Sequence, residues 1–276
     1  MATHIPIAER ADVRDGRSNA CKAFAMLKAY SDHSGTCVGS SITAIGGFVA
    51  TPWVWQSAEA AWRSVLADYS QYGVTWFNPV ECATGTGQFE RVTLPLRNLT
   101  RMRLAKTLLK YELLPVWAAV VNKDWNTCVT SEFLRVFPRP FDLCYDQIIR
   151  QLYLWSASKS NVNPIPPVFS IQTSDGDGVQ EDHEWYLEHS GACERVSELT
   201  FECPSRIVPL QMAGLLAHAF HQELFERPEP KSVVSWPPRS AAAEFGAISN
   251  GVCFSGPAMK AAVERRITKI RDWISN

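Results

Sequence analysis

The chain has 276 residues, with 27 Lys and Arg against 28 Asp and Glu, which gives a formal net charge of −1 at pH 7. This balance excludes a globally basic nucleic-acid binder, so any contact with nucleic acid needs a local basic face. Hydrophobic residues make up 46% and charged residues 20% of the chain, a composition that excludes a disordered polyampholyte. The length fits one large domain or two small ones.

The sequence predicts neither a membrane span nor a secretory signal. The longest strongly apolar stretch, residues 113–121, contains Pro115 and is far shorter than the roughly 20 residues of a membrane helix. The first 25 residues carry many charges and no apolar signal-peptide core. We therefore expect a cytoplasmic protein with no membrane partner. The eight cysteines form no C-x-x-C pair and are expected to be free thiols.

The first half of the chain alternates between strand and helix patterns. After a polar arm at residues 1–24, strands are predicted at 25–31 and 41–50. A helix at 53–69 follows, with Thr51 as its N-cap and Pro52 in its first turn. The next predicted elements are a strand at 74–80, a basic helix at 96–111 and a buried strand at 113–121.

The second half continues the alternation. It predicts helices at 141–158, at 179–193 and from 209, and strands at 168–173 and 199–203. Strands alternating with helices predict an α/β fold, with a mixed central sheet flanked by helices. We expect one domain at residues 25–226, between the arm and a proline-rich linker with a C-terminal helical extension at 227–276.

Acidic residues fall at or just after the ends of four predicted strands: Asp32, Glu81, Asp175 and Glu202. Carboxylates at strand ends can converge at one edge of a sheet, and hard oxygen ligands of this kind bind Mg²⁺ or Mn²⁺. The alternative is that each acid is an ordinary turn or cap residue. His33 has the same two interpretations, as a general base beside the site or as a turn residue without a role.

Two segments resemble a known family. Residues 30–35, Tyr-Ser-Asp-His-Ser-Gly, resemble the strand-end Asp-Glu-Ser-Gly signature of the domain of unknown function 3800. Residues 208–218 resemble the family's C-terminal Leu-Gln-x-Ala-Asp-Leu-x-Ala helix. The resemblance covers about residues 25–225. It implies a ribonuclease H-like α/β fold and a metal-dependent nuclease acting on DNA or RNA, in a mobile-element or phage-defence setting.

The resemblance also implies roles for individual residues. Asp32, Glu81 and Asp175 would be catalytic ligands of Mg²⁺ or Mn²⁺. The sequence departs from the family where His33 replaces an acid and where Gly214 replaces the helix Asp. The loss of a carboxylate weakens a divalent-metal site, although Glu202 or His218 could substitute.

These departures leave three hypotheses open. The first is a metal-dependent nuclease. The second is a catalytically degenerate ribonuclease H-like fold that serves as a nucleic-acid-binding or protein-interaction module. The third is a hydrolase of a smaller phosphate or ester substrate.

A cluster of basic residues in the predicted helix at 96–111 is the candidate nucleic-acid face: Arg97, Arg101, Arg103, Lys106 and Lys110. Such a run of one sign supplies a local field that the overall charge lacks. The alternative is a solvated helix face with no ligand. The expected partners are nucleic acid and a protein, which includes a second copy of this chain.

Overall fold

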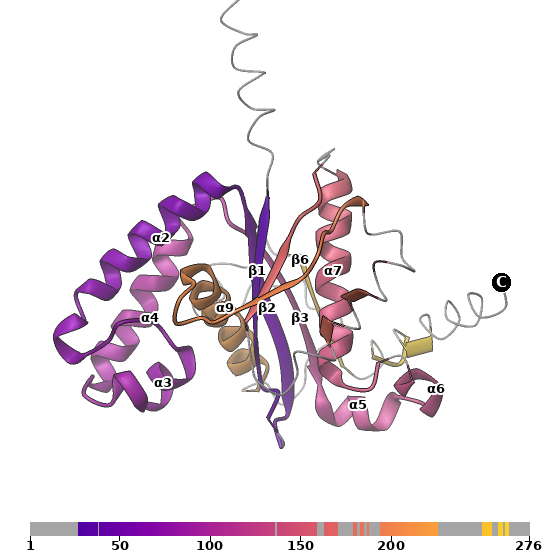
Figure 1. Cartoon of the computed structure of the whole chain (residues 1–276). Helices are drawn as coiled ribbons and strands as arrows, with labels where there is room; N and C mark the ends of the chain where they lie inside the picture. The colour runs from indigo at the N-terminus through magenta and orange to yellow at the C-terminus, as the bar shows by residue number, and fades with distance from the viewer. Residues whose placement is uncertain are drawn as a thin grey trace, which may run out of the picture.

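A mixed six-stranded β-sheet with helices on both faces forms the centre of the protein (Figure 1). The structure is a computed structural model that describes residues 27–37, 39–135, 137–158, 163–170, 179–180, 183–184, 187, 194–225, 250–255, 259–261 and 263–264. The predicted fold class, α/β with a mixed sheet flanked by helices, is confirmed. Within the described residues, no helix is long and apolar enough to cross a membrane.

The sheet has the strand order β5-β4-β1-β2-β3-β6. Its strands are β1 Lys28–Ser34, β2 Ile42–Ala50, β3 Leu114–Val121, β4 Pro167–Ser170, β5 Thr200–Glu202 and β6 Asn250–Phe254. β1, β2 and β3 pair antiparallel in sequence order. β4 pairs parallel with β1, β5 with β4, and β6 with β3. The ends of β1, β4 and β5 therefore meet at one edge of the sheet.

The helices form two layers. They are α2 Pro52–Ala67, α3 Pro79–Thr84, α4 Leu94–Leu108, α5 Asn122–Cys128, α6 Ser131–Leu134, α7 Pro140–Ser158 and α9 Val208–Phe225. α9 lies against the sheet with α2, α3 and α4 outside it, and α7 covers the other face with α5 and α6 nearby (Figure 1). A buried aromatic cluster that includes Trp62, Trp117 and Phe220 fills the α9 side, and Phe169 and Ile148 pack on the α7 side.

The strand predicted at 74–80 is wrong. Val74 and Phe77 are buried in a loop, and helix α3 begins at Pro79. The Asn78 side chain caps this helix by accepting hydrogen bonds from the backbone N–H groups of Val80 and Glu81. An Asn N-cap followed by Pro is a helix-start pattern, so the apolar residues here fill the core instead of forming a ladder.

The other predicted elements that fall on described residues lie near their predicted positions, with three additions. β1 extends to Ser34, so Asp32 lies inside the strand and not at a turn that follows it. The sequence did not predict α5, α6 or β6, and β6 joins the sheet from residues 250–254, beyond the expected domain. The predicted limits at 24 and 226 lie outside the described residues, as do most of the helix predicted at 179–193 and most of the extension at 227–276.

Helix α9 packs unusually close to the sheet. A Cβ atom placed on Gly46 of β2 would lie 2.6 Å from the backbone nitrogen of Ala217 and 2.9 Å from its Cα. Such distances are shorter than real Cβ contacts, so the absence of a side chain at Gly46 allows the close approach. This approach sets how much space remains between α9 and β1.

Candidate functional site

The carboxylate of Asp32 is buried between β1, β4 and α9. The residue is 9% exposed. Its Oδ1 atom accepts a hydrogen bond from the backbone N–H of His33 at 2.8 Å and another from the hydroxyl of Ser170 at the end of β4. The parallel pairing of β1 with β4 places Ser170 beside Asp32. One oxygen of the carboxylate is therefore bonded within the protein.

The other oxygen of Asp32 faces the backbone of α9. A Cβ atom placed on Gly214 would lie 2.5 Å from Oδ2 of Asp32 and 3.6 Å from Cγ of Pro79. Oδ2 of Asp32 therefore lies against the backbone of α9 at Gly214. A carboxylate side chain at position 214 would meet this oxygen.

Burial has a clear electrostatic consequence for Asp32. Desolvation raises the pKa of its carboxyl above the usual range, and this effect outweighs three that lower it. Those three are the charge of His33 and the hydrogen bonds from Ser170 and from the backbone N–H of His33. Burial thus disfavours the ionised form of Asp32.

His33 packs toward the opposite layer of the protein. Its ring contacts Phe141 of α7 edge-on, with centroids 5.5 Å apart. Its Nδ1 atom lies 3.7 Å from Oδ1 of Asp32, beyond hydrogen-bond distance. The predicted role of His33 as a general base stays a prediction.

Glu81 lies in the first turn of α3 and not at a strand end. Its carboxylate accepts a hydrogen bond from the backbone N–H of Gln88 at 3.1 Å and lies against the turn at Gly87. The Asn78 side chain also donates to it at 3.5 Å. These contacts direct Glu81 to the turn that follows α3, where it closes the loop.

The two remaining predicted ligands have different outcomes. Glu202 ends β5 in register with Ser170 and is exposed. It therefore lies at the same level of the sheet as Asp32 but two strands away, a separation of about 10 Å between the strands. Asp175 lies outside the described residues.

The described residues do not fit the Mg²⁺ or Mn²⁺ site that the family resemblance implies. Among them, no group of three or more His, Cys, Asp or Glu side chains could hold a metal ion. Ser170 supplies a hydroxyl at the end of β4, and Gly214 supplies no donor on α9. A divalent cation of this class needs several oxygen ligands, and Asp32 alone provides one buried carboxylate.

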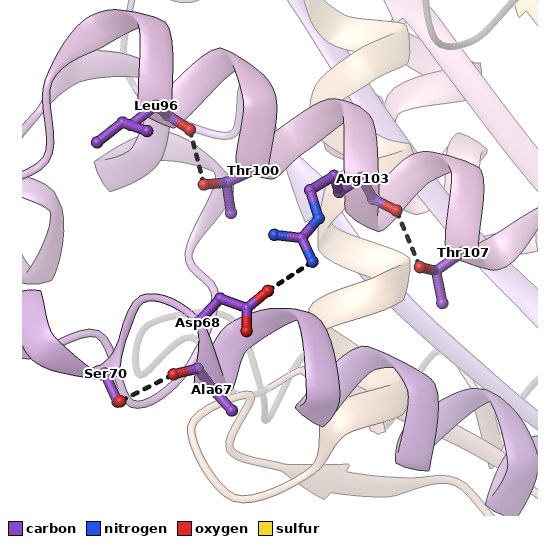
Figure 2. A network of polar contacts seen from close by, with 7 residues as sticks. All are labelled: Ala67, Asp68, Ser70, Leu96, Thr100, Arg103 and Thr107. Carbon is purple, nitrogen blue, oxygen red and sulfur yellow. Dashed lines mark hydrogen bonds and ion pairs between the residues drawn. The ribbon is translucent and has the colours of Figure 1, made fainter.

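Each of the three arginines of α4 forms hydrogen bonds with a different neighbouring segment. Arg97 donates to the backbone oxygens of Cys82 and Ala83 at 3.1 and 3.0 Å and so closes the end of α3. Arg101 donates to Gln222 of α9 at 2.7 Å. Arg103 binds Asp68, the residue that follows α2, at 2.6 Å (Figure 2). The three arginines thus attach α4 to α3, to α9 and to the end of α2.

Two lysines of the same helical segment lie at the surface. Lys106 and Lys110 are exposed. The prediction that the five basic residues bind nucleic acid stays a prediction.

Sequence reasoning missed the roles of two residues near the site. Ser170 fell inside a predicted strand, and only the parallel pairing with β1 shows that its hydroxyl bonds Asp32. Gln211 belongs to the family-like motif, but its amide oxygen accepts from Trp62 Nε1 and from the backbone N–H of Phe77. The Gln211 amide group therefore attaches α9 to α2 and to the loop before α3.

His218, one turn beyond Gly214, is a buried histidine within the α9 layer. Neither of its ring nitrogens has a hydrogen-bond partner among the described residues. Burial, and then the positive charges of Arg101 and His221, lower the pKa of His218 to about 4. The imidazole is consequently neutral at physiological pH.

Comparison with solved structures finds distant similarity to ribonuclease H enzymes. A chain of the PCNA:RNase HII complex from Archaeoglobus fulgidus is 12% identical, with a TM-score of 0.39, over 89% of this chain and 91% of that chain. Bst-RNase HIII in complex with Mn²⁺ is 9% identical, with a TM-score of 0.34, over 74% of this chain and 54% of that chain.

Neither the protein-family models nor the curated proteins contain a match to the chain. Membership of the domain of unknown function 3800 family thus stays a prediction. At the identities and TM-scores given above, the solved structures assign no activity, metal or partner to this chain.

Proposed function

We propose that this chain is a catalytically degenerate ribonuclease H-like module that binds a partner instead of cleaving a phosphodiester. The observation that carries the proposal is the environment of Asp32. Its Oδ1 is bonded to Ser170 and His33, and its Oδ2 lies against the α9 backbone at Gly214. Asp32 is therefore part of the contact between α9 and the sheet.

The contacts of α4 favour a protein partner over nucleic acid. The guanidinium groups of Arg97, Arg101 and Arg103 already donate hydrogen bonds to oxygen atoms of the protein itself. These oxygens belong to a backbone carbonyl, a side-chain amide and a carboxylate. Phosphate recognition uses the same donors. A phosphate contact by any of these three arginines would therefore have to break contacts that join α4 to α2, α3 and α9.

A metal-dependent nuclease is the second candidate, and one feature favours it. Asp32 lies near the end of β1, at the level of Ser170 and Glu202, which end the two neighbouring parallel strands. Ligands of α/β proteins gather at the carboxyl ends of such strands. This function would require Asp175 as a further ligand.

The experiment that separates the two candidates is a cleavage assay on the full chain. Single- and double-stranded DNA and RNA are incubated with wild type and with Asp32→Asn in Mg²⁺ or Mn²⁺, and product formation is followed on denaturing gels. The binding module predicts no difference between the two proteins and no metal-dependent product. Metal-dependent cleavage that Asp32→Asn abolishes would establish the nuclease and overturn the proposal.

A further inference from the structure

The inner side of α4 combines core residues, among them Leu104 and Leu108, with polar groups, whereas its outer side carries an apolar stripe. Thr100 and Thr107 are buried and donate their hydroxyl groups to the backbone oxygens of Leu96 and Arg103, four residues earlier (Figure 2). The inner side also carries the arginines that bond α3 and α9. The buried hydroxyl groups of this side are therefore satisfied within the helix itself.

The outer side of α4 presents apolar side chains to solvent. Leu99, Met102 and Leu109 are 39%, 44% and 41% exposed, although residues of these types are usually buried. They lie three and seven residues apart, and Lys106 occupies the position between Met102 and Leu109 that continues the series. A spacing of alternately three and four residues is the a/d pattern of a heptad, which forms one seam along a helix.

The charge of this seam indicates what can cover it. Lys106 lies at an a position and Lys110 at the neighbouring e position, and both are exposed. Residues 92–111 contain no Asp or Glu. Two copies of the seam would therefore place lysines against lysines, which disfavours a symmetric dimer through this face.

We propose that the outer face of α4 and of the turn that follows it, formed by Leu99, Met102, Lys106, Leu109 and Lys110, docks an acidic amphipathic helix of a partner protein. The partner helix would place apolar residues against the leucines and Met102 and a carboxylate opposite Lys106. A charged residue at a single a position fixes the register of such a pair. This inference rests on the proposed function and adds the chemical class of the partner.

The inference is tested with designed peptides and the full-length protein. One peptide has three heptads with Leu at its a and d positions, except for a Glu placed to face Lys106. A second peptide carries Lys in place of that Glu. Fluorescence anisotropy measures binding of both peptides to wild type, Met102→Gln, Lys106→Glu and the control Leu154→Gln, which alters an exposed leucine on α7.

The expected result is that the Glu peptide binds wild type and the control equally. Met102→Gln and Lys106→Glu should each weaken this binding by at least about tenfold. The Lys peptide should bind Lys106→Glu better than wild type, because the charge pair is restored with reversed sign.

Several results would overturn the inference. The Glu peptide would fail to bind wild type, or Leu154→Gln would weaken its binding as much as Met102→Gln does. The third such result is that the Lys peptide binds Lys106→Glu no better than it binds wild type. Stronger binding of the same face to an oligonucleotide or to anionic vesicles would also overturn it, as would a dimer that Met102→Gln dissociates in sedimentation equilibrium. The cleavage assay does not depend on this face, so failure here leaves the binding-module proposal to be judged by that assay.

Discussion

The central residue of the account is Asp32, whose carboxylate is buried without a full charge partner. Ser170 and the backbone N–H of His33 satisfy one oxygen, and the other faces Gly214. Burial raises the pKa of Asp32, so ionisation of this residue lowers the stability of the folded state. The destabilisation is absent below about pH 3.8, where the carboxyl is protonated in both states, and develops as the pH rises through the folded-state pKa.

Asp32→Asn should accordingly stabilise the protein at pH 7. The amide oxygen still accepts from Ser170 and His33, while the buried charge is removed, so we expect a gain of about 1 to 3 kcal/mol in the free energy of unfolding. Urea unfolding followed by circular dichroism at pH 7 and at pH 4 measures the gain, which should shrink at the lower pH. The exposed Glu90→Gln is the matched control, and a loss of stability in Asp32→Asn at pH 7 would contradict the account.

The lowered pKa of His218 makes the folding stability depend on pH in the direction opposite to that expected for Asp32. Burial lowers its pKa to about 4 from an ordinary value of 6.5, so the unfolded chain binds a proton that the folded protein does not. Stability from this residue is complete above about pH 6.5 and is lost as the pH falls to about 4. The loss amounts to at most about 3 kcal/mol.

His218→Phe keeps an aromatic ring at this position and removes the titration. Its free energy of unfolding should fall less than that of wild type between pH 7 and pH 4, with the difference measured by urea unfolding at intervals across this range. Parallel pH curves for the two proteins would show that His218 does not carry the dependence.

At the scale of elements, the contact between α9 and the sheet determines what the candidate site can hold. Gly46 lets Ala217 approach β2, and Gly214 lets the helix backbone reach Asp32. A longer side chain at residue 214 would have to push α9 away from β1. The glycine that interrupts the family-like motif is therefore explained by packing.

Gly214→Ala should destabilise the protein despite the higher helix propensity of Ala. The added Cβ would meet Asp32 Oδ2 at 2.5 Å, and overpacking of a core typically costs about 1 to 3 kcal/mol. A double-mutant cycle with Asp32→Ala measures the coupling by chemical unfolding. Gly214→Ala should cost much less in the Asp32→Ala background, and additive effects would contradict the proposed contact.

Local sequence signals predicted an element correctly where its structure depends on its own residues alone. Thr51-Pro52 correctly placed the start of α2, and the continuous apolar run correctly placed β3. Asn78-Pro79 carries the same helix-start signal, but the apolar residues before it were interpreted as a strand. β6 was missed because it depends on pairing with β3, more than a hundred residues earlier in the chain.

The candidate site was harder to predict, because its contacts join distant segments. Asp32 was identified from its motif, but the cover over its carboxylate comes from β4 and α9. No spacing in the sequence shows that Ser170 bonds Asp32. The basic run of α4 was likewise visible, whereas the inward direction of its arginines depends on where α2, α3 and α9 lie.

At the scale of the whole molecule, a six-stranded sheet lies between two helical layers, and Asp32 is buried at the contact between the sheet and α9. Ser170 and Gly214 are neighbours of its carboxylate, and neither supplies a second carboxylate for a divalent cation. The outer helix α4 then offers an apolar and basic face for a partner. We therefore expect that Asp32 is a buried interior carboxyl group that binds no divalent cation.

Thermal unfolding of wild type and Asp32→Asn, with and without millimolar Mn²⁺, tests this claim most directly. A ligand that binds only the folded state stabilises it by RT ln(1 + L/Kd), where L is the free ligand concentration, so the Tm rises as the ligand concentration exceeds Kd. The account predicts that Mn²⁺ leaves the Tm of wild type unchanged and that Asp32→Asn melts at a higher temperature than wild type. A rise in the Tm of wild type with Mn²⁺ that is absent in Asp32→Asn would contradict it.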